Sequence, residues 1–92
     1  MAGLPPSEYR VLFSPSAQHQ LRRLPRTDQQ RITVRIDQLA IAPRPRGVIK
    51  LEGQDDLYRI RVGKYRVIYG IQDDELVVLV LRIGHRRDVY RG

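Results

Sequence analysis

The sequence has no cysteine among its 92 residues, which excludes a disulfide framework, a thiolate nucleophile and a thiolate metal site. It also lacks long apolar runs. The longest such run is residues 76–81, bracketed by Glu75 and Arg82, whereas a membrane-spanning helix needs about 20 apolar residues. Residues 1–7 contain neither the basic nor the apolar region that marks a protein for export. We therefore expect a cytoplasmic protein that does not contact a membrane.

Motifs for metal binding and for nucleophilic catalysis are also missing. His19 and His85 are the two histidines, and they are too far apart in the chain to form an HxxxH or similar metal-binding spacing. Ser14 and Ser16 are better explained as helix caps than as nucleophiles, because no histidine and acid are arranged around them. No glycine-rich phosphate loop is present. The sequence therefore predicts no metal site and no cofactor.

The composition indicates one soluble globular domain over residues 1–92. Apolar residues make up 41% of the chain and charged residues 29%, a balance typical of a folded protein rather than a disordered one. Two separate cores are excluded at this length, because each half would be too small to bury enough apolar surface. Residues 1–7 have no assigned task, and we expect them to be disordered.

Basic residues dominate the charge. The 17 lysines and arginines outnumber the 10 acidic residues and give a net charge of +7. A basic domain of this size fits a polyanionic partner, with nucleic acid as the leading candidate. Lys50 and Lys64 are the only lysines, and the bias toward arginine favours bidentate phosphate contacts and stacking. A GC-rich genome that encodes arginine in place of lysine would give the same bias, so the positions of the arginines have to decide.

Two short amphipathic helices are predicted in the first half of the chain. Residues 9–13 form a strand-like run, after which Ser14 and Pro15 provide an N-cap and a first helical residue. The first helix ends at Pro25, and the second begins at Thr27 and ends before Pro43. Their apolar stripes are Ala17, Leu21 and Leu24 in the first helix and Ile32, Ile36, Leu39 and Ala40 in the second. Two such helices separated by a proline turn predict an antiparallel helical hairpin.

Beyond residue 47 the apolar pattern changes to the period of two that is typical of strands. A short strand is expected over residues 48–51, followed by three consecutive strands over residues 57–62, 65–71 and 75–83. Gly63 and Lys64 form a two-residue connection with glycine first, which favours a type II′ hairpin turn. The chain is therefore predicted to have an α+β fold in β-α-α-β-β-β order, with a small antiparallel sheet and the helical hairpin packed on one face.

The two-residue turn fixes the register of this strand hairpin. Arg61 then faces Arg66, and Arg59 lies on the same face of the sheet, because side chains alternate along a strand. The opposite face carries the residues that can form the core under the helices: Tyr58, Ile60, Val62, Tyr65, Val67 and Tyr69. Like charges directly opposed on a sheet cost about 0.2 to 1 kcal/mol. The three guanidinium groups therefore predict a phosphate-binding site, although each arginine alone also fits an ordinary solvated sheet face.

Residues 84–92 form a basic tail that carries further reactive groups. It contains His85, Arg86, Arg87, Tyr90 and Arg91. Gly84 would let this tail fold back across the sheet, so that its side chains meet the arginines of the hairpin. Histidine titrates near neutral pH, which makes His85 a candidate acid or base. A frayed basic terminus explains the same composition equally well.

The strings YRIRVGKYRVIY at residues 58–69 and GHRRDVY at residues 84–90 resemble the RelE/ParE toxin superfamily, whose order of elements fits the chain from Tyr9 to Tyr90. The resemblance implies the toxin half of a type II toxin–antitoxin pair, with a cognate antitoxin, RelB-like or of another class, as its partner. In the RelE branch the implied activity is cleavage of mRNA in the ribosomal A site. In the ParE branch the same fold inhibits DNA gyrase without nuclease chemistry.

The resemblance also implies which residues form the site. RelE-type toxins have cationic side chains at the positions of Arg59, Arg61 and Arg66, then an arginine and a tyrosine after the last strand. The tail residues that match are Arg86, with Arg87 as the alternative, and Tyr90. The best-known branch has lysine at the first two positions, and Arg59 and Arg61 cannot accept a proton as such a lysine could. The other basic residues expected to contact RNA or the ribosome are Lys50, Lys64, Arg87 and Arg91.

These residues and the resemblance together predict a metal-free endoribonuclease that acts by transphosphorylation on mRNA engaged by the ribosome. The ribose 2′-hydroxyl would attack the adjacent phosphorus and leave a 2′,3′-cyclic phosphate and a 5′-hydroxyl. Arg61 and Arg66 would stabilise the charge that grows on the phosphate oxygens, and Arg86 would protonate or shield the leaving oxygen. Tyr90 would stack on a base. Two alternatives stay open, namely a gyrase inhibitor of the ParE kind and an RNA-binding module without catalysis.

Overall fold

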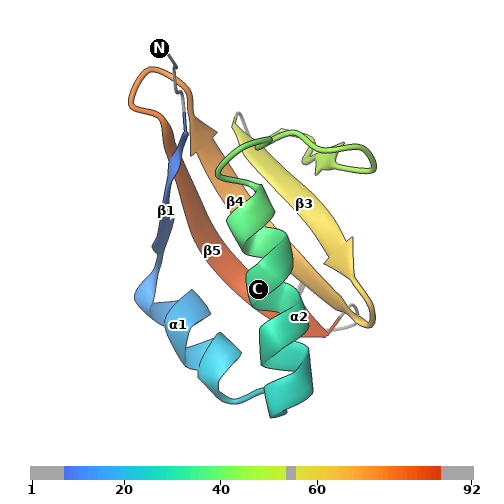
Figure 1. Ribbon diagram of the computed structural model, residues 1–92. Helices are drawn as coiled ribbons and strands as arrows, with labels where there is room; N and C mark the ends of the chain where they lie inside the picture. Colours follow the sequence, from blue (N-terminus) through green and yellow to red (C-terminus); the bar gives the residue numbers. More distant parts are fainter. Residues whose placement is uncertain (1–7, 54–55, 86–92) are drawn as a thin grey trace.

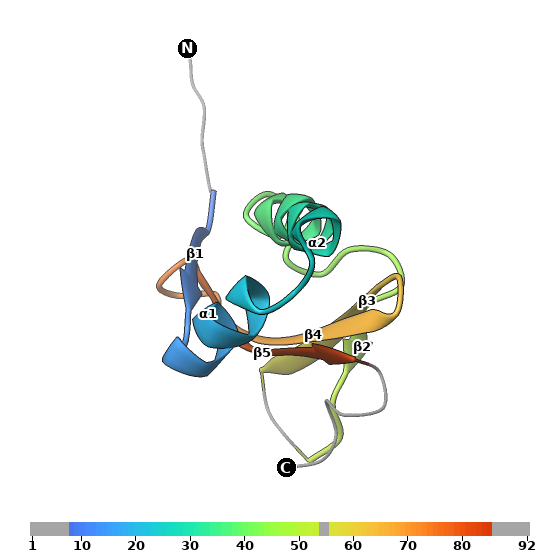
Figure 2. The same ribbon diagram turned by 90° about the horizontal axis from the view of Figure 1, so that it is seen from below.

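The computed structural model of the chain describes residues 8–53 and 56–85. They form one five-stranded sheet with two helices on one side of it (Figure 1, Figure 2). The elements in chain order are β1 (Arg10–Phe13), α1 (Pro15–Arg22), α2 (Arg26–Gln38), β2 (Ile49–Lys50), β3 (Leu57–Val62), β4 (Tyr65–Gln72) and β5 (Val77–His85). The predicted α+β fold class is confirmed. Neither helix has the length and apolar character that crossing a membrane requires.

Both helices begin within one residue of the predicted positions. The Ser14 hydroxyl accepts a hydrogen bond from the Ala17 amide at 3.1 Å, so Ser14 caps α1 and Pro15 takes its first position. The second helix, α2, begins at Arg26, and Pro25 stands immediately before it. Pro25 thus separates the two helices, as the sequence indicates, and residues of both helices join the core with the sheet.

The core lies between the helices and one face of the sheet. Ile32 and Ile36 of α2 are fully buried, whereas Val34, which is off the apolar stripe, is 56% exposed. The rest of the buried cluster is Ala17, Leu39, Tyr58, Ile60, Val62, Val67, Tyr69, Ile71, Val78, Val80 and Ile83. Each fully buried isoleucine contributes about 1.5 to 3 kcal/mol through the removal of apolar surface from water. The alternate residues of β3 and β4 that were expected to face the helices do so.

The strands are ordered β1-β5-β4-β3-β2 across the sheet. The pairs β2–β3, β3–β4 and β4–β5 are antiparallel, as predicted, but β1 runs parallel to β5. The sheet is therefore mixed rather than wholly antiparallel. Tight turns fix the relative direction of the strands that they join. Two helices separate β1 from the later strands, so no local signal in the sequence sets its direction.

The β3–β4 hairpin has the predicted register. The pairs are Leu57 with Gly70, Tyr58 with Tyr69, Arg59 with Ile68, Ile60 with Val67, Arg61 with Arg66 and Val62 with Tyr65. Gly63 has a φ of +60°, and Lys64 is not among the residues with positive φ. A positive φ at the first central residue alone is the pattern of a type II′ turn. The turn and the alternation of side chains together fix which residues share a face.

One bulge interrupts the pairing of β4 with β5. Ile68 pairs with Arg82, but the next residue, Tyr69, pairs with Val80, so Leu81 is an extra residue in β5. An extra residue in one strand reverses the faces that the following side chains occupy. As a result, Ile83 lies in the core, and Arg82 lies on the face opposite the helices.

The first helix holds this bulge through two side chains. The Ser14 hydroxyl donates a hydrogen bond to the Leu81 carbonyl at 3.0 Å. The Gln20 side-chain oxygen accepts from the Ile83 amide at 2.7 Å. These bonds satisfy backbone groups of β5 at the bulge and two residues beyond it, so Ser14 and α1 stabilise this part of the strand.

Candidate functional site

Four arginines gather on the sheet face opposite the helices, and we call them the arginine face: Arg59, Arg61, Arg66 and Arg82. Arg61 and Arg66 are cross-strand partners beside the hairpin turn. In the adjacent row, Ile68 of β4 pairs with Arg59 on one side and with Arg82 on the other. The predicted trio therefore lies on one face, and a fourth cation extends it onto β5.

The four arginines of the arginine face differ in solvent exposure. Arg61 is exposed at the sheet edge, whereas Arg59, Arg66 and Arg82 are half-buried. The Nε atom of Arg66 is buried. Opposed like charges on a sheet are unfavourable, and partial burial strengthens the repulsion because less water screens it. A phosphate offsets this repulsion and accepts hydrogen bonds from several guanidinium groups at once.

Sequence reasoning does not find Arg82. Counted by simple alternation from Val78 and Val80, Arg82 falls on the helix-facing side, where the charge would have to be buried. The bulge at Leu81 turns Arg82 to the arginine face instead. In the structure, the core residues of β5 are spaced by two from Val78 to Val80 and by three from Val80 to Ile83, because of the bulge.

The structure places His85 on the other side of the sheet from the arginine face. It pairs with Tyr65, and the two rings meet edge to face with centroids 6.1 Å apart. The Tyr65 hydroxyl donates to Asp28 of α2 at 3.0 Å, and this bond raises the pKa of Tyr65. The pair therefore belongs to the helix-facing side. A role of His85 as acid or base stays a prediction, and the structure does not bring its imidazole to Arg66.

The other predicted contact residues are not collected on the arginine face. Lys64 is exposed in the hairpin turn next to it. Lys50 pairs with Tyr58, whose side chain faces the helices, so Lys50 lies on the opposite side of the sheet. Four predicted residues lie outside the described ones, namely Arg86, Arg87, Tyr90 and Arg91. Their roles stay predictions.

The end of the sheet remote from the hairpin turn contains an arginine with well-defined partners. Arg44 binds Asp73 through both terminal guanidinium nitrogens, at 3.2 and 2.7 Å, and donates to the Tyr58 hydroxyl at 3.2 Å. The Tyr9 hydroxyl donates to the same carboxylate at 2.6 Å. Hydrogen bonds from Arg44 and Tyr9 lower the pKa of Asp73 to about 2. We call these four residues the Arg44–Asp73 cluster.

Other acidic residues lie at this remote end as well. Asp74 and Glu75 follow Asp73 in the turn between β4 and β5, away from the start of β4 where Arg66 is located. Within residues 8–53 and 56–85, no three His, Asp or Glu side chains are grouped so that they could hold a metal ion. The acidic residues of the turn between β4 and β5 therefore lie at the end of the sheet away from the Arg61–Arg66 pair.

The geometry suits recognition of a phosphodiester. Arginine donates in a planar fork that matches phosphate oxygens, and two hydrogen-bonded strands hold the groups on a rigid support. Fixed positive charge can stabilise negative charge that develops on phosphate oxygens during a reaction. Arginine cannot accept a proton, so the arginine face is chemically able to bind an anion and stabilise its charge but not to act as a base.

Comparison with known proteins identifies the family. A sequence profile described as "ParE toxin of type II toxin-antitoxin system, parDE" matches residues 11–90. The toxin RelG of Mycobacterium tuberculosis is 30% identical over 88 residues, which cover 90% of this chain and 97% of RelG. The archaeal RelE–RelB complex from Pyrococcus horikoshii OT3 matches with a TM-score of 0.77 and 37% identity, over 92% of this chain and 99% of that chain. The isolated RelE toxin of E. coli matches with a TM-score of 0.76 and 29% identity, over 89% of this chain and 90% of that chain. The chain therefore belongs to the RelE/ParE family of toxins from type II toxin–antitoxin systems.

Proposed function

We propose that this RelE-type toxin is an endoribonuclease that cleaves mRNA on the ribosome and thereby stops translation. The observation that carries the proposal is the direct pairing of Arg61 with Arg66, on a face that also holds Arg59 and Arg82. Selection for stability alone does not account for such a pairing, because it is unfavourable in the absence of an anion. The similarity to toxins named RelE and RelG supports the same branch of the family.

Cleavage proceeds by transphosphorylation within the RNA. The ribose 2′-oxygen bonds to the adjacent phosphorus while the bond from phosphorus to the 5′-oxygen breaks. The 2′-hydroxyl gives its proton to solvent water and the leaving 5′-oxygen takes one, so the products are a 2′,3′-cyclic phosphate and a 5′-hydroxyl. Arg61 and Arg66 hold the phosphate and stabilise the charge on its non-bridging oxygens, a contribution that is commonly about 10²- to 10³-fold in rate. Arg59 and Arg82 extend the cationic surface beside them.

The remaining steps are assigned to the tail and to the ribosome. Arg86, or Arg87 in its place, protonates or shields the leaving oxygen, and Tyr90 stacks on a base of the RNA. The residues that contact RNA or ribosomal phosphates are Lys50, Lys64, Arg87 and Arg91. The arginine face offers no proton acceptor. A weak acid–base set of this kind explains why the ribosome is needed to orient the mRNA.

A cognate antitoxin is part of the same proposal. The relatives from P. horikoshii OT3 and M. tuberculosis were solved as RelE–RelB and RelBE2 toxin–antitoxin complexes. A strongly basic toxin, with a net charge of +7, is best covered by a partner segment that carries acidic and apolar side chains. Such a segment would block RNA and neutralise the arginine face together.

Primer extension on an mRNA undergoing translation in a purified system tests the nuclease proposal. We expect new 5′ ends only at ribosome-engaged codons, with 5′-hydroxyl and 2′,3′-cyclic phosphate termini on the fragments. The same mRNA without ribosomes should stay intact. Full-length mRNA after incubation of ribosome-engaged message with the folded protein would refute the proposal.

A second candidate function is inhibition of DNA gyrase, because the matching family profile is the one described for ParE toxins. In this alternative the basic surface docks on the enzyme without cutting RNA. Supercoiling of relaxed plasmid by purified gyrase separates the two candidates. A RelE-type protein leaves supercoiling unchanged, and a loss of supercoiling together with intact mRNA would favour the ParE type.

A further inference from the structure

The first strand, β1, forms one edge of the sheet and pairs on one side only, with β5 (Figure 1). The amides of Arg10 and Ser14 both bond toward β5. Because successive backbone groups of a strand point to opposite edges, those of Leu12 also face β5, and those of Val11 and Phe13 point outward. In the described part of the chain, no group accepts a hydrogen bond from the Val11 or Phe13 amide. Both residues are therefore open to a further strand.

The open part of this edge is short and is closed at both ends. On one side, the Tyr9 amide donates to the Ala40 carbonyl at 2.8 Å, so the segment that follows α2 covers the edge. On the other side, Pro15 begins α1 and has no N–H to donate. Val11 and Phe13 are left as the two outward-facing residues. A long extended peptide would find only these two residues to pair with, whereas β1 of a second copy has the same span.

This row of donors and acceptors is complementary to itself. When two β1 strands run antiparallel with Leu12 opposite Leu12 of the second copy, Val11 of each strand faces Phe13 of the other. Each of these pairs can exchange two N–H···O=C bonds, because all of its residues face outward. The two Leu12 residues then occupy a non-hydrogen-bonded pair, in which side chains are closest. Leu12 is 43% exposed in the single chain, so this pairing also buries apolar surface.

Charges permit this register. Arg10 faces Ser14 of the second copy, so two arginines are not opposed. Glu8 lies two residues before Arg10 and is exposed, and in this register it approaches the first turn of the second copy's α1. That turn contains no acidic residue, and the N-terminus of a helix favours negative charge.

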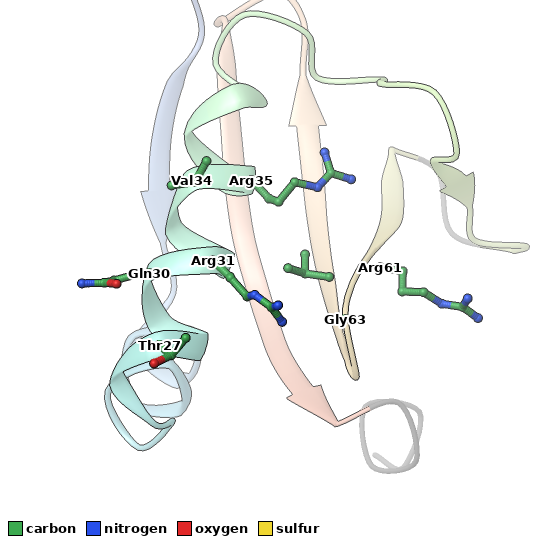
Figure 3. Close-up of a pocket in the computed structure, with 8 residues that line it drawn as sticks. Thr27, Gln30, Arg31, Val34, Arg35, Arg61 and Gly63 are labelled. Atoms are coloured by element: carbon green, nitrogen blue, oxygen red, sulfur yellow. The ribbon is translucent and has the colours of Figure 1, made fainter.

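The opposite edge of the sheet is unsuited to a second copy. β2 covers only Tyr58 and Arg59 of β3, and the uncovered end of β3 borders a groove whose lining includes Arg31, Arg35 and Arg61. Figure 3 shows Arg31 and Arg35 extending from α2 toward β3, with Arg61 on the outer side of that strand. Two copies that met here would bring these cations together, which is unfavourable. The electrostatics therefore favour β1 as the edge for self-association.

Exposed apolar side chains surround the open edge of β1. Of the five large apolar residues that are exposed in the described part of the chain, three lie on or beside β1, namely Leu12, Ile41 at 74% and Leu76 at 39%. Ile41 follows Ala40, whose carbonyl accepts from Tyr9, and the Leu76 carbonyl accepts from the Arg10 amide. Exposed apolar groups around an unpaired strand edge are typical of a protein interaction surface.

We propose that two copies of this chain associate through β1, which pairs antiparallel with β1 of the second copy about Leu12 and joins the two sheets into one. Each strand has only four residues, so the dimer is weaker than one whose interface buries 1,000 Å² or more, the size of about the smallest stable interfaces. Its population therefore depends on concentration. No residue of β1 belongs to the arginine face, so the arginine faces of both copies stay uncovered and the inference does not depend on the nuclease proposal.

Sedimentation equilibrium of the full chain tests the association. We expect the average mass to rise from one copy toward two copies between about 10 µM and about 1 mM protein, and not beyond two. Leu12→Lys sets like charges directly opposite each other at the two-fold axis, so this variant should stay a single copy. Ile49→Lys is the matched control, because Ile49 is similarly exposed, at 46%, on β2 at the other edge, and it should associate like the unmodified chain.

Three results would overturn the proposal. The first is a single-copy mass of the unmodified chain over the whole concentration range. The second is undiminished association of folded Leu12→Lys, which would place the contact elsewhere. The third is an equal loss of association in Leu12→Lys and Ile49→Lys, because net charge rather than the β1 edge would then control it.

Amide exchange of the ¹⁵N-labelled unmodified chain locates the paired edge without any variant, so the proposal stays testable if Leu12→Lys does not fold. Exchange of the Val11 and Phe13 amides should slow by about 3-fold or more between the same two concentrations, because new backbone hydrogen bonds protect them. The Tyr9 amide, already bonded to Ala40, should be unchanged. Association without protection of Val11 and Phe13 would overturn pairing through β1. If a capped peptide of alternating glutamate and valine protects both amides while the chain stays a single copy, the edge binds a peptide instead.

Discussion

Arginine is used in opposite ways at the two ends of the sheet. In the Arg44–Asp73 cluster, Arg44 is bound by a carboxylate at 2.7 and 3.2 Å, and its guanidinium lies 5.2 Å from the centre of the Tyr58 ring. In the arginine face, Arg61 stands directly opposite Arg66. The first arrangement pairs a cation with a carboxylate, and the second sets two cations opposite each other. An added anion offsets the repulsion between Arg61 and Arg66, and for this reason we propose that the RNA binds there.

Substitution of Arg66 should give the largest difference in activity between the arginine face and the rest of the sheet. Arg66→Ala removes a half-buried donor from the phosphate site, so cleavage should fall by about 10²- to 10³-fold and growth arrest should disappear. Viable counts after induction measure the effect, with circular dichroism to verify the fold. Arg10→Ala is the matched control, because Arg10 is an exposed arginine on β1 at the other edge of the sheet. A toxic Arg66→Ala protein would show that the arginine face is not the site.

Loss of the Ser14 hydroxyl should affect stability and site together. Ser14→Ala removes the N-cap of α1 and the bond to the Leu81 carbonyl, so the free energy of unfolding should fall by about 1 to 2 kcal/mol. Urea unfolding measures this change, and Ser14→Thr should restore most of it because it keeps the hydroxyl. We also expect lower cleavage from the folded Ser14→Ala protein, since the bulge positions Arg82. Unchanged stability would contradict the role of Ser14 at the bulge.

Loss of Arg82 should weaken RNA binding by one phosphate contact. In fluorescence anisotropy with single-stranded RNA, Arg82→Ala should reduce the slope of log affinity against log salt concentration by about 0.7. Arg44→Ala removes the same charge from the Arg44–Asp73 cluster and should leave the slope unchanged. Equal slopes for Arg82→Ala and the unmodified protein would remove Arg82 from the RNA surface.

Acid should weaken the Arg44–Asp73 cluster, and this is the smallest expected effect. The folded state lowers the pKa of Asp73 from 3.8 to about 2, so the unfolded chain binds more protons between these values. The stabilisation from this carboxylate is therefore complete above about pH 4 and is lost as the pH falls toward 2. Thermal unfolding from pH 5 to pH 2 should show a shallower loss of stability for Asp73→Asn than for the unmodified protein. Asp74→Asn is the matched control, and identical profiles for all three proteins would contradict this role of Asp73.

Local signals in the sequence predict the part of the candidate site whose strand register is set by a tight turn. Gly63 and Lys64 fix the register of β3 and β4, so the pairing of Arg61 with Arg66 follows from a two-residue loop and strict alternation. The starts of the helices follow in the same way from a serine cap and from prolines, whereas both helices end several residues before the prolines that were expected to end them, at Arg22 and Gln38. These features depend on residues that are neighbours in the chain, which is why they can be predicted.

The bulge in β5 is the feature that alternation does not predict. It depends on Ser14 and Gln20, which are more than 60 residues away in sequence from the backbone groups that they bind. One extra residue moves Arg82 onto the arginine face and moves His85 off it. The same distance in sequence explains why the parallel pairing of β1 with β5 was not predicted.

Single-turnover cleavage of ribosome-bound mRNA, mapped by primer extension, tests the central claim most directly. The proteins to compare are the unmodified toxin, the double variant Arg61→Ala, Arg66→Ala, and the matched double variant Arg10→Ala, Arg44→Ala. We predict normal codon-specific cuts for the first and the third, and no detectable cuts for the folded Arg61→Ala, Arg66→Ala protein. Cuts of normal rate from that protein, or their loss only in the Arg10→Ala, Arg44→Ala protein, would contradict the assignment of the arginine face as the RNA-cleaving site.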